Sequence, residues 1–102
     1  MRFLVEGRSM EPDYFQGDFL ISVSFGSIKV GSDVVFCDPR GGNRRLLKRV
    51  VNKKNGKVFV MGLNESFTTD SREFGWIEEN MVLGKVILRY YPLFGRGKFW
   101  FW

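Results

Sequence analysis

The sequence predicts an all-β fold, organised as a single compact domain with a coiled or barrel-like sheet over residues 1–102. Apolar runs of strand length are separated by glycine turns about every eight to twelve residues, a spacing typical of small β proteins. No stretch of helical length carries apolar residues at the period of a helix. Aromatic residues make up 17% of the chain, and we expect these large side chains to fill its small core.

Six strands are expected in chain order, at residues 3–5, 19–23, 33–37, 45–51, 57–61 and 83–90. Turns are predicted at residues 31–32, 41–43 and 55–56. The pair Asn55 and Gly56 gives the strongest turn signal. Both residue types tolerate a positive φ, and they stand between two apolar runs, as in a two-residue hairpin. Residues 78–81 are expected to form a brief helical turn, and residues 92–95 an exit loop.

The residue inventory excludes several kinds of chemistry. There is no histidine, so Ser-His-Asp, Cys-His and histidine–metal mechanisms are ruled out. The single cysteine, Cys37, can form neither an internal disulfide nor a zinc cluster. We therefore expect no metal and no cofactor. A serine activated by a neutral lysine is one of the few hydrolytic designs that remain.

Charge and hydropathy give expectations about partners and location. The net charge is +5, but the cations are spread along the chain, so we expect a solvated basic face and no nucleic-acid partner. The chain has no long apolar run and no secretory signal pattern at its N-terminus, so we expect a cytoplasmic protein that does not span a membrane.

The aromatic tail, which consists of Phe99, Trp100, Phe101 and Trp102, has two interpretations. Packing onto the domain is favoured, because a free tail would expose a large apolar patch. The alternative is a peripheral contact with a membrane, since aromatic side chains suit the membrane interface.

Ser9 is the first candidate functional residue. Gly7 precedes it and Pro12 follows it, so its hydroxyl should lie in a defined bend and not in a regular element. Such a bend suits a nucleophile. In isolation, however, a serine in this setting most often satisfies only the local backbone.

Lys48 is the candidate base. Alternation along residues 45–51 puts Lys48 on the same face as Leu46 and Val50. Burial among aliphatic side chains would lower the pKa of its amine, by about 3–5 units in the extreme. The alternative is a lysine whose amine reaches the solvent at the rim of a half-exposed strand, and the strand pattern alone does not decide between the two.

Residues 62–75 form the longest run without strand character. Loops of this length in a small domain are often functional or mobile. Asp70 and Arg72 could pair to hold the shape of the loop, and the Thr68 hydroxyl could orient a neighbouring amine. Taken alone, the segment is more simply a solvated surface loop with an exposed ion pair.

Together, these three stretches resemble the Ser/Lys-dyad peptidases of the signal peptidase I and LexA-like superfamily, peptidases S24 and S26. The matching segments are a serine box at residues 9–12 (Ser-Met-Glu-Pro) and 17–18 (Gly-Asp), a lysine box at residues 32–35 (Ser-Asp-Val-Val) and 48–51 (Lys-Arg-Val-Val), and a loop at residues 62–64 (Gly-Leu-Asn) and 70–75 (Asp-Ser-Arg-Glu-Phe-Gly). Three boxes in the right order are far more specific than any one of them.

The resemblance implies a serine endopeptidase that cleaves a leader or signal-type peptide from a precursor protein. Ser9 would be the nucleophile, with its backbone N–H donating to the oxyanion, and Lys48 would be the general base. The residues expected to support the oxyanion hole and the dyad are Gly7, Met10, Thr68, Asp70 and Arg72. A short version of the family that ends in the segment Val-Ile-Leu-Arg-Tyr-Tyr-Pro, here residues 86–92, is most similar to the small soluble members known as nickel-type superoxide dismutase maturation proteases.

Three positions depart from the family pattern. Leu63 stands where the family usually has Asp, and Ser32 replaces a glycine-type turn residue. Gly7 lies where some members carry a second oxyanion-hole hydroxyl, so a weaker oxyanion hole is expected.

Two other functions remain as alternatives. A self-processing LexA-like regulatory domain would need a cleavable segment and a DNA-binding module upstream, and the chain begins only eight residues before Ser9. A non-catalytic peptide-binding or membrane-associated β module would not need both Ser9 and Lys48. We therefore expect a peptidase, with an extended substrate added as a strand beside residues 3–6.

Overall fold

The described chain is built from short antiparallel β strands. The computed structural model describes residues 1–24, 26–64, 66, 68–90 and 99–101. Its strands are β1 (Arg2–Leu4), β2 (Phe19–Val23), β3 (Asp33–Cys37), β4 (Arg45–Lys54), β5 (Lys57–Met61), β6 (Ile77–Glu78), β7 (Val82–Tyr90) and β8 (Phe99–Phe101). The helical segments are α1 (Ser71–Phe74) and the 3-10 turn η2 (Glu79–Met81). The predicted all-β class is confirmed.

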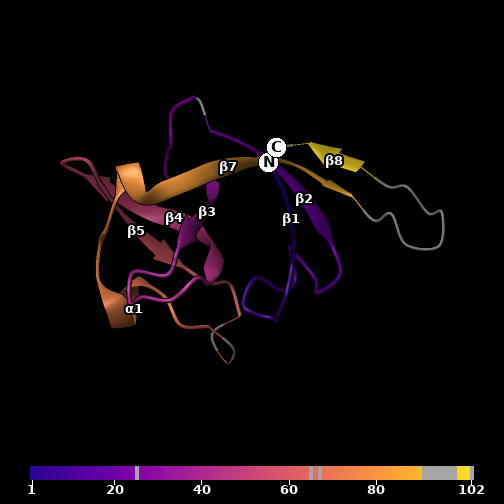
Figure 1. Ribbon diagram of the computed structural model, residues 1–102, viewed down its shortest axis with the longest axis horizontal. Helices are drawn as coiled ribbons and strands as arrows, with labels where there is room; N and C mark the ends of the chain where they lie inside the picture. Colours follow the sequence, from indigo (N-terminus) through magenta and orange to yellow (C-terminus); the bar gives the residue numbers. More distant parts are fainter. Residues whose placement is uncertain (25, 65, 67, 91–98, 102) are drawn as a thin grey trace.

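All these strands belong to one sheet, in the order β1-β2-β7-β3-β4-β5-β6, with β8 paired to β7. The long strand β7 joins the β1–β2 pair to the β3–β6 meander, and Figure 1 shows it crossing between the two groups. The sheet does not close, since its order ends at β1 and β6. Of the two forms expected, the open coiled sheet is therefore the one observed.

Most strands lie where the sequence predicts them. β2, β3 and β5 have the expected bounds, β7 begins one residue earlier, β1 is shifted one residue toward the N-terminus at both ends, and η2 lies within the expected helical turn. β4 runs past residue 51 to Lys54, because it continues to the hairpin turn. In that turn Asn55 and Gly56 have φ values of 51° and 76°, as a two-residue hairpin of this type requires.

Three short elements were not expected from the sequence. β6, β8 and α1 each span two to four residues, too few for a hydrophobic period to show. β8 pairs its backbone with residues 88–90 of β7, so this part of the tail lies along the sheet. Trp102 and the expected exit loop at residues 92–95 lie outside the described residues. Nowhere in the described residues is there a helix with the length and hydropathy that a membrane crossing requires.

The core has two clusters, one on each face of β3. Val34 and Phe36 are buried in the first, together with residues of β4, β5 and β6. Val35 points the other way, into the second cluster, where it packs with Val5, Met10 and other residues of the N-terminal segment. Because side chains alternate along a strand, β3 packs against residues of β4 with one face and against the turn that carries Ser9 with the other.

Candidate active site

Ser9 lies in the turn between β1 and β2, and contacts on both sides hold this turn. The next residue, Met10, is only 2% exposed and belongs to the second core cluster. The carbonyl oxygen of Ser9 accepts a hydrogen bond of 2.8 Å from the Asn64 N–H. Within the described residues, the N–H of Ser9 has no hydrogen-bond partner. The turn is therefore held in place, while the Ser9 N–H remains available to donate to a bound group.

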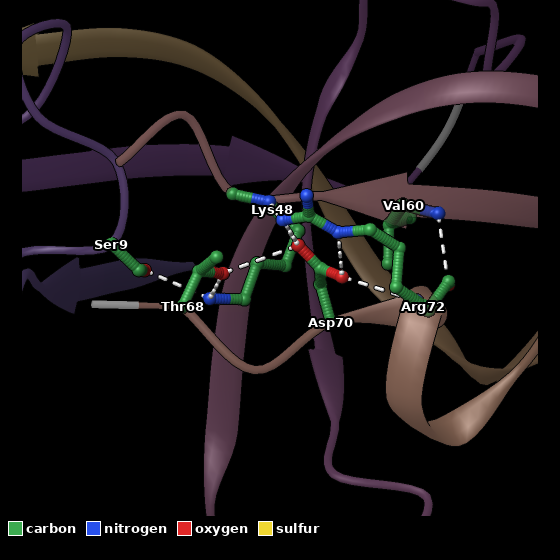
Figure 2. A network of polar contacts seen from close by, with 8 residues as sticks. Ser9, Lys48, Val60, Thr68, Asp70 and Arg72 are labelled. Carbon is green, nitrogen blue, oxygen red and sulfur yellow. Dashed lines mark hydrogen bonds and ion pairs between the residues drawn. The ribbon is translucent and has the colours of Figure 1, made fainter. Parts of the chain in front are cut away.

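Lys48 reaches Ser9 from β4. Its side chain lies on the buried face of the strand with Leu46 and Val50, as the alternation predicts, and is 4% exposed. Its Nζ lies 2.8 Å from Ser9 Oγ and 3.1 Å from Thr68 Oγ1. Figure 2 shows the three side chains converging from β4, the Ser9 turn and the loop after β5. The alternative of an amine that extends into solvent is not observed.

The surroundings of Lys48 favour its neutral form. Burial is the main cause that lowers the pKa of its amine to about 8, and the charges of Arg44 and Arg40 lower it further. The carboxylate of Asp70 acts in the opposite direction. A neutral amine within hydrogen-bonding distance of a hydroxyl can accept its proton, so this pair has the geometry of a base and a nucleophile.

Asp70 organises the loop that carries Thr68. Burial raises the pKa of its carboxyl, but the hydrogen bonds from Arg72 and from the Gly62 N–H outweigh this effect and lower the pKa to about 2. The Arg72 guanidinium donates to both carboxylate oxygens, at 3.0 and 2.8 Å, so the expected ion pair is present. The Thr68 hydroxyl lies 3.3 Å from Asp70 Oδ2, which links the ion pair to the Lys48 amine (Figure 2).

Gly62 is a site residue that sequence reasoning did not single out for its geometry. A Cβ at this position would overlap the Thr68 side chain and would lie 3.0 Å from the carbonyl oxygen of Ser9. Its N–H donates to Asp70 Oδ2 at 2.9 Å. The only sequence signal was its place at the start of the third matching segment.

A second polar network was also missed, and it lies on the other face of β4. Arg49 donates to both oxygens of Asp33, at 2.7 and 3.0 Å, and to Asp13 at 2.7 Å. The hydroxyl of Tyr14 donates to Asp33 at 2.6 Å. Burial and the neighbouring Asp33 carboxylate raise the pKa of Tyr14, so this phenol stays protonated. Asp33 and Arg49 lie in the matching lysine box, but their contacts to residues 13 and 14 are tertiary.

A cleft with a volume of about 620 Å³ opens beside the Ser9–Lys48 pair, and both residues line it. One wall is formed by residues 3–10, and the other by Arg40 and residues 43–48 of the β3–β4 hairpin. Gly7 lies on the first wall with φ of 80° and no atom within 4 Å of the place where a Cβ would be, so this stretch is open. The volume suits a segment of extended peptide.

The predicted site residues are thus largely brought together. Ser9, Lys48, Thr68, Asp70 and Arg72 form one chain of contacts in Figure 2. Gly7 lines the cleft without a side chain, and Met10 contributes by anchoring the turn in the core and not by reaching the amine. Within the described ranges, no group of three or more His, Cys, Asp or Glu side chains could hold a metal ion.

The chain is similar to known proteases. The family model described as "Signal peptidase, peptidase S26" matches residues 1–54 and 51–91. The mitochondrial ATP-independent inner membrane protease subunit 1a of Arabidopsis thaliana is 29% identical over 115 residues, which cover 86% of this chain and 68% of that protein. Signal peptidase I of Bacillus caldolyticus is 46% identical over 37 residues, which cover 36% of this chain and 20% of that protein. Signal peptidase IB of Staphylococcus aureus matches with the same identity and length and is covered to 19%.

Proposed function

Because the chain belongs to the signal peptidase family, peptidase S26, we propose that it is a serine endopeptidase with Ser9 as nucleophile and Lys48 as general base. The observation that carries the proposal is the distance of 2.8 Å between Ser9 Oγ and the amine of a lysine that is only 4% exposed. In this proposal residues 1–102 form one catalytic domain.

The proposed reaction begins when Ser9 Oγ attacks the carbonyl carbon of the scissile peptide bond. The hydroxyl proton passes to Lys48 Nζ, and the N–H of Ser9 donates to the oxyanion that forms. The lysine then gives its proton to the leaving amine, and the acyl group stays on Ser9. A water molecule then gives a proton to Lys48 and attacks the ester carbon. The bond to Ser9 Oγ breaks, Lys48 returns the proton to Ser9 Oγ, and the carboxylic acid product leaves.

The remaining contacts support this proposal by restricting the Lys48 amine. Thr68 Oγ1 at 3.1 Å gives the amine a second partner, which directs it toward Ser9. Asp70 holds Thr68 and, with its pKa near 2, stays ionised and does not compete as a base at neutral pH. Gly7 offers no hydroxyl, so in this mechanism the oxyanion depends mainly on backbone donors.

We propose that the substrate is a precursor protein whose leader or signal-type peptide enters the cleft in an extended form. β1 stands at one end of the sheet and, among the described strands, pairs only with β2. Its outer edge can therefore pair with a substrate backbone, as in other cases of strand addition. A leader on a metalloenzyme precursor, as in the nickel-type maturation proteases, remains a narrower prediction.

The proposal is tested by incubating the purified protein with a peptide library and identifying new N-termini by mass spectrometry. We expect cleavage by the wild type and none by Ser9→Ala, while Ser24→Ala, at an exposed serine outside the cleft, should cleave normally. The free energy of unfolding of Ser9→Ala should equal that of the wild type to within about 0.5 kcal/mol, because a loop hydroxyl contributes little to stability. Equal cleavage by Ser9→Ala would refute the proposal.

A further inference from the structure

The walls of the cleft carry an unbalanced positive charge. Among the described residues that line it, four are arginines, Arg8, Arg40, Arg44 and Arg45, and the only carboxylate is Glu6. A cleft lined mainly by one sign of charge raises the local concentration of ligands with the opposite sign.

The four arginines are not equally available. Arg40 is held by Asp38, whose carboxylate lies 2.7 Å away, and Arg8 forms an ion pair with Glu11 at 3.3 Å. Arg45 lies over the Phe3 ring, with 5.5 Å between its guanidinium carbon and the ring centre, and so bridges the two walls. Arg44 is exposed and forms no ion pair or hydrogen bond through its side chain with any described residue.

The distance between Arg44 and Lys48 determines which residue of a bound peptide would lie beside Arg44. Arg44 comes four residues before Lys48 and directly precedes β4, and its carbonyl accepts a hydrogen bond of 2.9 Å from the Asp38 N–H, so the hairpin pairing extends to it. An even spacing along an extended chain places both side chains on the same side. At about 3.3 Å per residue, this separation corresponds to roughly 13 Å along the strand. A peptide laid along the cleft covers that distance with about four residues. Both Arg44 and Lys48 line the cleft, so the two side chains border a common space.

We propose that Arg44, with Arg45 beside it, makes this cleft select extended peptides that carry an acidic side chain about three or four residues from the scissile bond. The inference rests on the proposed function for the location of that bond. It adds a specificity determinant that is separate from the Ser9–Lys48 pair. The ligand is a carboxylate on a peptide, paired with a guanidinium that forms no ion pair or hydrogen bond with a described side chain.

The experiment uses one cleavable peptide in which Asp and Asn are exchanged at each position on both sides of the scissile bond. For the wild type at low salt, we expect kcat/KM to favour Asp over Asn by about threefold or more at one or two positions three or four residues away. Arg44→Gln should bring this ratio close to one, and Arg44→Glu should invert it. The ratio should also decrease as the salt concentration rises.

Lys54→Gln is the matched control. It removes the same charge from an exposed position at the far end of β4, outside the cleft, and should keep the wild-type ratio. Because each ratio compares two peptides on one enzyme, any change in the Lys48 pKa caused by losing Arg44 cancels. A wild-type ratio near one at every position, or an unchanged ratio in Arg44→Glu, would overturn the inference.

A binding measurement separates this inference from the proposed function. The same fluorescently labelled peptides are titrated with the Ser9→Ala protein and followed by anisotropy. Tighter binding of the Asp peptide that depends on Arg44 would support charge selection even if the wild type cleaved no peptide, a result that would contradict only the peptidase proposal. Equal binding of the Asp and Asn peptides, or no binding of either, would overturn the charge selection itself.

Discussion

Arg49 Nη2 lies 2.7 Å from Asp13 Oδ2, so the residue that follows Lys48 on β4 contacts the turn that carries Ser9. Through Asp33, the same guanidinium is linked to the Tyr14 hydroxyl. Two successive residues of one strand therefore act on the same turn from opposite faces. Lys48 contacts Ser9 itself. Arg49 contacts the turn four residues after Ser9, at Asp13, and through Asp33 also five residues after it, at Tyr14.

Arg49→Lys should lower activity by loosening this arrangement. A lysine keeps the charge but cannot make the paired contacts to Asp33, whose side chain is 1% exposed. We expect kcat to fall by about tenfold with a smaller change in KM, since a misplaced nucleophile affects the chemical step most. The free energy of unfolding should fall by about 2–4 kcal/mol, because the buried Asp33 carboxylate loses its best partner.

Asp13→Asn is the control for this variant. Asp13 is 45% exposed, and a pair of this exposure contributes little, so stability should change by no more than about 1 kcal/mol. Urea unfolding and steady-state kinetics measure both effects. An Arg49→Lys enzyme with wild-type kcat and stability would show that the network does not position the turn.

The Asp70 carboxylate should affect both the rate and the pH profile. Asp70→Asn weakens the ion pair with Arg72 and the contact to Thr68, so the maximal rate should fall by about tenfold. The negative charge at position 70 raises the pKa of Lys48. Its loss should therefore move the rise of kcat/KM with pH to lower pH, a shift that purely structural damage would not produce.

Thr68→Val separates these two effects. It removes the hydroxyl between Asp70 and the amine but keeps the carboxylate. We expect a reduced rate with the pH profile close to that of the wild type. An Asp70→Asn profile that does not move to lower pH would show that this carboxylate has no electrostatic effect on the base.

The strand pattern and the resemblance predicted different parts of the site. Alternation along β4 is local, so the face that Lys48 shares with Leu46 and Val50 could be read from residues 45–51, but the burial of its amine could not. The contact of Lys48 with Ser9 joins residues 39 positions apart, and no local pattern encodes such a distance. It could be expected only because the two boxes resemble those of one family.

Other features could not be predicted, because they depend on how the elements pack. The need for glycine at position 62 follows from the approach of Thr68 and of the Ser9 backbone, which exists only in the folded chain. The contacts of Arg49 with Asp13 and of Tyr14 with Asp33 likewise join separate elements. β6 and β8 were missed because strands of two and three residues carry too little sequence pattern.

The aromatic tail can be tested by deleting residues 99–102. β8 pairs with β7 through its backbone, so the deletion should lower the free energy of unfolding, by about 1–3 kcal/mol. A thermal melt measures this loss, and co-sedimentation with anionic liposomes measures membrane contact. Unchanged stability together with lost liposome binding would instead identify the tail as a membrane anchor.

Lys48 gives the most direct test of the mechanism, because its charge should control both activity and stability. With a pKa of about 8, the amine gains its neutral form as the pH rises through that value, so kcat/KM should rise and then level off. Lys48→Arg should be inactive, since a guanidinium does not lose its proton in this range. Lys48→Met should also be inactive, but it should be more stable than the wild type at pH 7, by on the order of 1–3 kcal/mol, because it removes a buried amine and keeps the volume.

The sign of the pH dependence of stability follows from the same shift. Between pH 8 and 10.5 the folded protein has lost the Lys48 proton while the unfolded chain still binds it. The free energy of unfolding should therefore rise with pH across this range through Lys48, and the difference between wild type and Lys48→Met should shrink toward pH 10.5. Urea unfolding of both proteins at several pH values measures this. A constant difference, or an active Lys48→Met enzyme, would show that Lys48 is not a base with a lowered pKa.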